Sequence, residues 1–282
     1  MRGSATLLAH ACRACLQGRG VDSFFTCVDS HAIMLLMDIQ PVGHIETPYL
    51  TKFGVPRQPG LVSGATSTLT LGPEFEWVFE LRAGSYLWLI WDFSLNHRAG
   101  AKWSKTVRPP LLGGTRRVGV FATRSSFRPN NIAISSVRVE AAYRDESGRA
   151  CVLVTDADMV SGTPVYEVYP YDPATDSIKF AHGSWNDHVT WPTLERVVFV
   201  REDDSERCSR AGSGLEQVLL QDPRPAYTRA TSDERVFWLQ YGEYLCTFRV
   251  VEGTVVVLSV DVLTPAQKQE LITTGTLRGE FS

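Results

Sequence analysis

The chain has 282 residues, 44% of them hydrophobic and 10% aromatic, and a formal net charge of -3 at pH 7. These values are enough for a sizeable core in one large domain, or in a core domain with a smaller one. No stretch approaches the roughly 18–20 consecutive apolar residues of a membrane-spanning helix, and the six cysteines are irregularly spaced. We therefore expect a cytoplasmic protein with reduced thiols and no membrane contact.

The first 36 residues carry two acids and show no clear periodicity. We expect a poorly ordered leader or a mis-assigned start, with the folded domain beginning near Met37. The apolar stretch at Leu7–Leu8 is too short for a secretory signal. A small zinc site is an alternative reading of this segment, since it contains ligand types at close spacing: Cys12, Cys15, Cys27 and His31.

Residues 40–172 read as short β-strands divided by Gly, Pro, Asp and Ser. The run Tyr86–Leu95 is nearly continuous in apolar residues, as in a strand buried on both faces. Residues 118–122 are predicted as a second strand, and 134–142 alternate apolar with charged residues like a half-exposed strand. Another strand is predicted at 151–154. Many short strands without intervening helices favour a β-barrel.

A second region begins near Trp185. The charged residues 201–207 are predicted to be a solvated surface stretch. Leu215, Val218 and Leu219 form the apolar face of a short helix, and the two prolines in Asp222–Tyr227 predict an extended loop. Three further strands, predicted at 236–239, 245–251 and 254–262, form a small antiparallel sheet, and the end of the chain reads as weakly helical or frayed.

The predicted fold is mainly β, with an N-terminal β-barrel domain and a small α+β C-terminal domain. The predicted boundaries are a leader at 1–36, the barrel at 37–180, the C-terminal domain at 181–265 and a tail at 266–282. No glycine-rich nucleotide loop follows a strand, and neither a metalloenzyme histidine spacing nor a Gly-x-Ser-x-Gly motif is present. The sequence therefore argues against a doubly wound nucleotide-binding fold, and no metal site is predicted in the barrel.

Charge is segregated along the chain: residues 93–139 contain nine Lys or Arg and no Asp or Glu. Such a basic face on a mildly acidic protein indicates a polyanionic partner. The alternative is an ordinary solvated loop rich in arginine.

Four motifs in extended segments could carry chemistry. Val55–Leu61 has two prolines that fix the backbone around two polar side chains, although a plain surface turn has the same composition. Residues 106–117 present arginines in a Pro- and Gly-rich loop suited to phosphate. Residues 122–130 carry two arginines beside an asparagine and several hydroxyls, suited to a ligand or an RNA phosphate. Asp156 and Asp158 follow a strand and could accept hydrogen bonds from a ribose or a cationic amino group; capping a turn is their alternative role.

Taken in order, these motifs resemble the TsaA-like tRNA methyltransferases. The resemblance rests on Pro56–Gly60, Thr106–Gly114, Gly119–Asn130, Asp158–Pro164 and Asp222–Tyr227 and covers roughly residues 40–262. It implies a homodimeric β-barrel enzyme that uses S-adenosyl-L-methionine to methylate N6 of threonylcarbamoyl-adenosine beside the anticodon of threonine tRNA.

The resemblance also implies roles for particular residues. Leu95 and Ile134 are expected to wall the adenine of S-adenosyl-L-methionine. Other residues expected at this cofactor are Gln58, Pro59, Gly60, Ser94, Arg124, Thr155, Asp156, Ala157 and Asp158. Expected at the tRNA are Arg108, Arg116, Arg117, Arg128, Asn130 and Arg224. If a base assists the reaction, the candidates are Asp222 and Tyr227.

Three positions depart from the family pattern. Ser94 stands where many relatives have His, so no role that needs an imidazole is assumed there. Asn131 and Ala133 replace Pro and Gly after the Arg-Pro-Asn motif, which leaves the geometry of that loop open. These departures keep two alternatives: an RNA-binding barrel without catalytic activity, and a methyltransferase for another substrate.

Overall fold

The computed structural model describes residues 39–75, 78, 80–98, 100, 102–186, 193–229 and 235–277. The predicted leader and the possible zinc ligands lie outside these residues. All elements named below belong to one compact unit, Pro41–Ser282. In the described part of the chain, no helix is both long and apolar enough to cross a bilayer.

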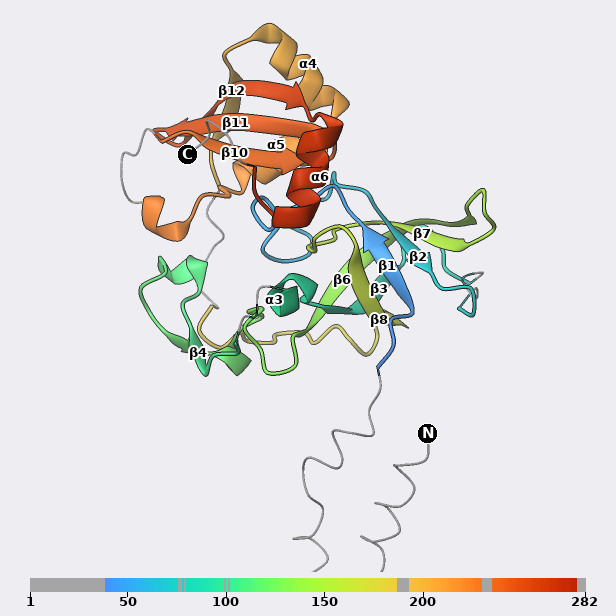
Figure 1. Ribbon diagram of the computed structural model, residues 1–282. Helices are drawn as coiled ribbons and strands as arrows, with labels where there is room; N and C mark the ends of the chain where they lie inside the picture. Colours follow the sequence, from blue (N-terminus) through green and yellow to red (C-terminus); the bar gives the residue numbers. More distant parts are fainter. Residues whose placement is uncertain are drawn as a thin grey trace, which may run out of the picture. The chain divides into compact units, whose positions relative to one another are not determined.

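The N-terminal half forms a closed barrel of antiparallel strands in the order β1-β2-β7-β6-β3-β8 (Figure 1). This confirms the predicted mainly β fold with an N-terminal barrel. The strands are β1 Gly43–Glu46, β2 Ser67–Leu71, β3 Tyr86–Asp92, β6 Ile132–Arg144, β7 Ala150–Thr155 and β8 Thr163–Pro170.

Side-chain alternation explains why these residues close into a barrel. Along β6, Val137 and Val139 are buried while Arg138 and Glu140 between them are partly exposed, as the sequence predicts. Buried apolar residues of the other strands, such as Leu69 and Leu89, belong to the same core cluster. Closure leaves no open sheet edge in this barrel.

The prediction for Tyr86–Leu95 was wrong in two respects. Strand β3 ends at Asp92, and the short helix α3 Ser94–Arg98 follows directly. Its burial also alternates, because Leu87 and Leu89 are buried while Trp88 lies on the other face. The Trp88 indole donates a hydrogen bond to Asp176 and packs near the Tyr171 ring, so residues after β8 cover this outer face.

The basic window forms loops between β3 and β6. A small hairpin of β4 Thr106–Val107 and β5 Val118–Gly119 encloses the 3₁₀ turn η2 Pro110–Leu112. The strand predicted at 118–122 is therefore only two residues long, and the 3₁₀ turn η3 Val120–Ala122 replaces its end.

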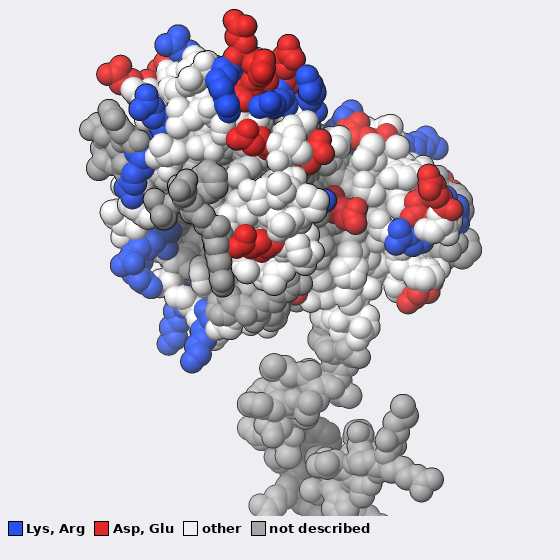
Figure 2. Space-filling model, turned by 45° about the horizontal axis from the view of Figure 1, so that its top comes forward, with Lys and Arg blue, Asp and Glu red and all other residues white. Residues whose placement is uncertain are grey.

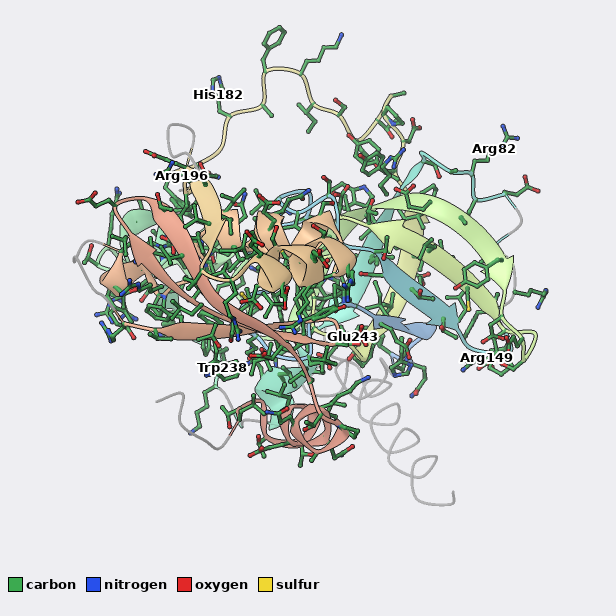
Figure 3. All side chains as sticks on the ribbon, turned by 90° about the horizontal axis from the view of Figure 1, so that it is seen from above. Arg82, Arg149, His182, Arg196, Trp238 and Glu243 are labelled. Atoms are coloured by element: carbon green, nitrogen blue, oxygen red, sulfur yellow. The ribbon has the colours of Figure 1, made fainter. Side chains whose placement is uncertain are left out.

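The C-terminal part is a sheet of order β10-β11-β12-β9 with helices on it. Its antiparallel strands are β10 Phe237–Tyr241, β11 Tyr244–Val251 and β12 Thr254–Val262. The sequence did not predict β9 Arg196–Phe199, which pairs with β12 in parallel. Helices α4 Glu202–Arg210 and α5 Ser213–Leu220 pack on one face, and α6 Pro265–Thr274 packs near Trp238 on the other (Figure 3).

The charged stretch 201–207 is not simply a solvated surface. It begins α4, and the Asp204 carboxylate is fully buried. This carboxylate accepts hydrogen bonds from Arg201, Arg207 and the backbone N–H of Val260 on β12. A buried charge with three donors fixes the helix on the sheet.

The segment between β1 and β2 packs into the core of the C-terminal sheet. Tyr49, Val62 and Ala65 belong to the same cluster as Leu239 and Phe248. The Gln240 side chain accepts a bond from the Leu50 N–H at 2.7 Å and donates to the Pro48 carbonyl at 3.0 Å. Residues 47–66, which carry the Pro56–Gly60 motif, are thus held by both the barrel and the C-terminal sheet.

Candidate active site

The described residues enclose a pocket of about 450 Å³ beside the end of β3. It is formed where four segments distant in sequence meet: the segment after β1, the β3–α3 junction, the loop before β6 with the start of that strand, and the loop after β7. We call it the inner pocket and define it by Lys52, Gln58, Leu95, Arg124, Ile134 and Asp158. Its volume lies in the range of small-molecule sites.

The walls of the inner pocket combine apolar side chains with a few polar groups. Leu95 and Ile134 present apolar surface, and Ile134 is exposed although it lies on a strand. Arg124 donates to the Gln58 amide oxygen at 3.3 Å. An apolar slot edged by a few polar groups is the usual form of a small-molecule site.

The Asp158 carboxylate lies at the wall of this pocket and is held by a chain of two hydrogen bonds. The Trp91 indole donates to Ser135 Oγ at 2.9 Å, and that hydroxyl donates to Asp158 Oδ1 at 2.5 Å. Burial raises the pKa of Asp158 from 3.8 to about 6, while the Ser135 bond and nearby Arg124 oppose that shift. A desolvated carboxylate of this kind favours a cationic partner.

The loop 123–131 that edges the pocket is held by its own backbone. Arg128 donates to the carbonyls of Val120 and Thr123, at 3.4 and 2.7 Å. Asn131 has a left-handed φ of 53° and accepts a hydrogen bond from the Phe93 N–H at 2.8 Å. Proline cannot adopt that φ, so the Asn131 departure from the family pattern gives this loop a backbone that a proline here would forbid.

A wider groove continues from the inner pocket and shares Gln58 and Arg124 with it. We call it the arginine groove; it encloses about 1220 Å³ and is defined by Arg57, Arg108, Arg117, Phe121, Arg124 and Trp185. No Asp or Glu is among the described residues that line it. Lys and Arg side chains gather at the lower left of Figure 2, the side on which Figure 1 places β4.

The predicted site residues separate into groups. Of those expected at the cofactor, the inner pocket includes Gln58, Ser94, Leu95, Arg124, Ile134 and Asp158. Its lining does not include Pro59, Gly60, Thr155, Asp156 or Ala157. Gly60 has a φ of 78° and open space around it, so the turn itself, rather than a close approach, explains this glycine.

Of the residues expected at the tRNA, Arg108 and Arg117 line the arginine groove. Arg128 lines the inner pocket instead, and the two surfaces do not include Arg116 or Asn130. Arg117 is partly engaged, because its guanidinium donates to the Thr106 hydroxyl and carbonyl.

Asp222, expected as a base, and Arg224, expected at the tRNA, form a buried pair. Their side chains form a bidentate ion pair with N···O distances of 2.8 and 3.0 Å, and the residues are 2% and 4% exposed. Arg229 lies 3.4 Å from the same carboxylate. The two side chains are thus paired with each other and shielded from solvent, and the roles expected for them stay predictions. Tyr227 is 72% exposed and lies outside both lining sets.

Sequence reasoning gave no role to several polar residues of the inner pocket, among them Lys52, Asp92, Asn96 and Ser135. Asn96 is 3% exposed, and its side chain joins Lys52 to the Ser126 carbonyl. Lys52 precedes the Pro56–Gly60 motif by only four residues, which was the one available signal. The other three gave none, because their strand or helix context is unremarkable in sequence.

Comparison with known proteins agrees with this geometry. Residues 44–177 match the family model of the tRNA-methyltransferase O N-terminal domain, and residues 200–263 match the TrmO C-terminal domain. The chain is 34% identical over 230 residues to a tRNA (adenine(37)-N6)-methyltransferase of Escherichia coli, covering 78% of this chain and 96% of that protein. It is 37% identical to a putative S-adenosylmethionine-dependent methyltransferase RcsF of Pseudomonas aeruginosa, covering 70% and 86%.

A solved structure shows the same fold. The crystal structure of TrmO from Pseudomonas aeruginosa superposes with a TM-score of 0.61 at 29% identity, covering 80% of this chain and 97% of that chain. Both domain models, the curated relatives and the solved structure agree over most of the described residues. The chain therefore belongs to the tRNA-methyltransferase O family, a family of S-adenosylmethionine-dependent tRNA methyltransferases.

Proposed function

We propose that this protein transfers a methyl group from S-adenosyl-L-methionine to N6 of threonylcarbamoyl-adenosine, next to the anticodon of threonine tRNA. The observation that carries the proposal is the inner pocket, where Gln58, Arg124 and Asp158 from three separate motifs meet between Leu95 and Ile134. Relatives named tRNA (adenine(37)-N6)-methyltransferase support the reaction class.

The residues of the inner pocket fit S-adenosyl-L-methionine. Leu95 and Ile134 would hold the adenine ring, and Asp158 is the carboxylate that would face a positive charge of this cofactor. When bound, the cofactor supplies a methyl group on a positively charged sulfur. Around it, Ser135 and Trp91 keep the Asp158 carboxylate in place through their two hydrogen bonds.

The protein's main contribution to the reaction is positioning. Adenine N6 is a weak nucleophile because its lone pair is delocalised into the ring, so it must be held in line at ~3–3.5 Å from the methyl carbon. Once methylated, this nitrogen is positively charged and acidic, and it loses its proton readily. A dedicated strong base is thus unnecessary, which agrees with the buried, paired state of Asp222.

The arginine groove supports tRNA as the partner. Clustered arginines attract phosphates, and exposed aromatic rings stack on unpaired bases. Phe121 is 76% exposed, and the Arg128 guanidinium lies 5.9 Å from the centre of its ring. An anticodon loop offers both groups, since its phosphates are anionic and its bases are unpaired. The family resemblance extends the proposal to a homodimer.

The setting we propose is the cytoplasm. The thiols of Cys151, Cys208 and Cys246 are free and buried, as is usual for proteins in a reducing compartment.

The direct test is mass spectrometry of nucleosides from threonylcarbamoylated threonine tRNA after incubation with the protein and S-adenosyl-L-methionine. We expect a product one methyl group heavier, absent when Arg124→Ala is used. Cofactor binding without methylation would point to another substrate. No cofactor binding would leave an RNA-binding protein and overturn the proposal.

We expect Phe121→Ala to weaken binding of the tRNA anticodon stem-loop by roughly 5- to 150-fold, because a stacked base contributes about 1–3 kcal/mol. The slope of log affinity against log salt should stay unchanged, since no charge is removed. Arg108→Ala should instead reduce that slope by roughly 0.7–0.9. Fluorescence anisotropy at several salt concentrations measures both quantities. Tyr143→Ala, an exposed aromatic near the far end of β6, is the matched control; equal losses in both aromatic variants would refute stacking at Phe121.

A further inference from the structure

Lys52 contributes a positive charge to the inner pocket from the segment after β1. Its Nζ donates to Asn96 Oδ1 at 3.0 Å. Asn96 is nearly inaccessible, and its Nδ2 donates to the Ser126 carbonyl at 2.6 Å, so the amide oxygen is fixed in direction. The flexible lysine is thereby aimed by a rigid neighbour at the place where α3 meets the loop before β6.

The arginines of the pocket already have partners within the protein. Arg57 donates to the backbone carbonyls of Gln221, Asp222 and Arg224. Arg128 donates to two carbonyls of its own loop. These guanidinium groups are committed to holding the backbone.

Lys52 is different in its bonding. An ammonium group has three donors, and one of them is used on Asn96. Among the residues that the structure describes, no salt bridge involves Lys52. Partial burial also lowers the pKa of Lys52, so placing the charge here carries a desolvation cost that an anionic ligand would offset.

We infer that Lys52, oriented by Asn96, binds a carboxylate of the ligand in the inner pocket. Two sources share this chemistry: the amino-acid carboxylate of S-adenosyl-L-methionine and the threonyl carboxylate of the modified adenosine. The second source rests on the proposed function, whereas the first requires only that the pocket binds the methyl donor. Lys52 would then select ligands that carry this carboxylate.

The first experiment measures binding by calorimetry in the absence of tRNA. Wild-type protein and Lys52→Met are titrated with S-adenosyl-L-methionine and with its decarboxylated analogue. If Lys52 pairs with this carboxylate, the wild type should prefer the parent by roughly 10- to 100-fold, and Lys52→Met should lose that preference. This result does not depend on which RNA is methylated.

The second experiment measures binding of an anticodon stem-loop that carries threonylcarbamoyl-adenosine, against the same RNA with its carboxylate capped as an amide. If Lys52 pairs with the threonyl group, wild type should discriminate between the two RNAs and Lys52→Met should not. Failure of the proposed function would appear separately, as absence of methylation by wild-type protein.

Two further variants separate charge recognition from general damage. Lys52→Arg keeps a cation and should retain most of the discrimination, while Lys268→Met removes an exposed lysine on α6 and should change nothing. If Lys52→Met loses discrimination in either experiment, the inference is supported, and that experiment identifies which carboxylate Lys52 binds. Discrimination that survives in both experiments, or equal weakening of each ligand and its carboxylate-free analogue, overturns it.

Discussion

Asp158→Asn is expected to make the protein more stable at pH 8 and to abolish most of its methyltransferase activity. The stability gain follows from burial, which raises the pKa of Asp158 to about 6, so a charge is held at a cost at pH 8. Asparagine removes that charge while its amide oxygen still accepts the Ser135 bond. The gain is at most about 3 kcal/mol, the free energy equivalent of the pKa shift.

The pH dependence of this effect has a definite sign. Between pH 3.8 and about 6, the folded protein keeps a proton on Asp158 that the unfolded chain has released. The free energy of unfolding of the wild type therefore falls as pH rises through this window. The variant lacks this contribution, so its advantage should be complete above pH 6 and vanish below pH 4. Urea unfolding at a series of pH values measures it.

The same substitution should weaken binding of S-adenosyl-L-methionine by roughly 30-fold or more, because loss of one partner from a buried charge pair costs about 2–5 kcal/mol. Calorimetry checks this value independently of turnover. Asp203→Asn removes an exposed carboxylate on α4 and serves as the control. Unchanged cofactor affinity in Asp158→Asn would remove Asp158 from the binding site.

Asp222→Asn is expected to destabilise the folded state by about 3–5 kcal/mol, since it leaves one buried and one mostly buried guanidinium group without their carboxylate. Asparagine tolerates the left-handed φ of 47° at this position, so backbone strain does not add to the loss. Equilibrium urea denaturation measures the change in the free energy of unfolding. Affinity for S-adenosyl-L-methionine should persist when it is measured at urea concentrations well below the unfolding transition.

A matched control is available on α4. Glu206→Gln also removes a carboxylate from an arginine, Arg210, but that pair is exposed and should be worth less than about 1 kcal/mol. The opposite pattern, unchanged stability with complete loss of turnover, would support Asp222 as a catalytic base.

Local pattern was sufficient to predict much of the fold. The alternation of Val137 and Val139 with charged residues gave β6 and the side of it that faces the core. The spacing of Leu215, Val218 and Leu219 gave α5. Both signals arise from neighbours along one element, so they are present in the sequence itself. Strand β9 gave no such signal, because its place beside β12 depends on a parallel pairing across more than fifty residues.

Residue type also misled where burial decides the role. Asp204 and Asp222 read as solvated or reactive carboxylates, yet each is buried against arginines. For Asp204 the sequence neighbours alone cannot show this, because its partners include a backbone group on β12.

The sequence by itself determined the order of the motifs, the segregation of basic residues and the family of the chain. Only the tertiary structure decided which members of those motifs share a pocket. Gln58, Arg124 and Asp158 line it, and Asp156 is not among its lining residues. Lys52 also lines it, although it belongs to none of the motifs. The physical reason is that a motif records residue types along the chain. Barrel closure and strand register set which side chains point to a common point in space.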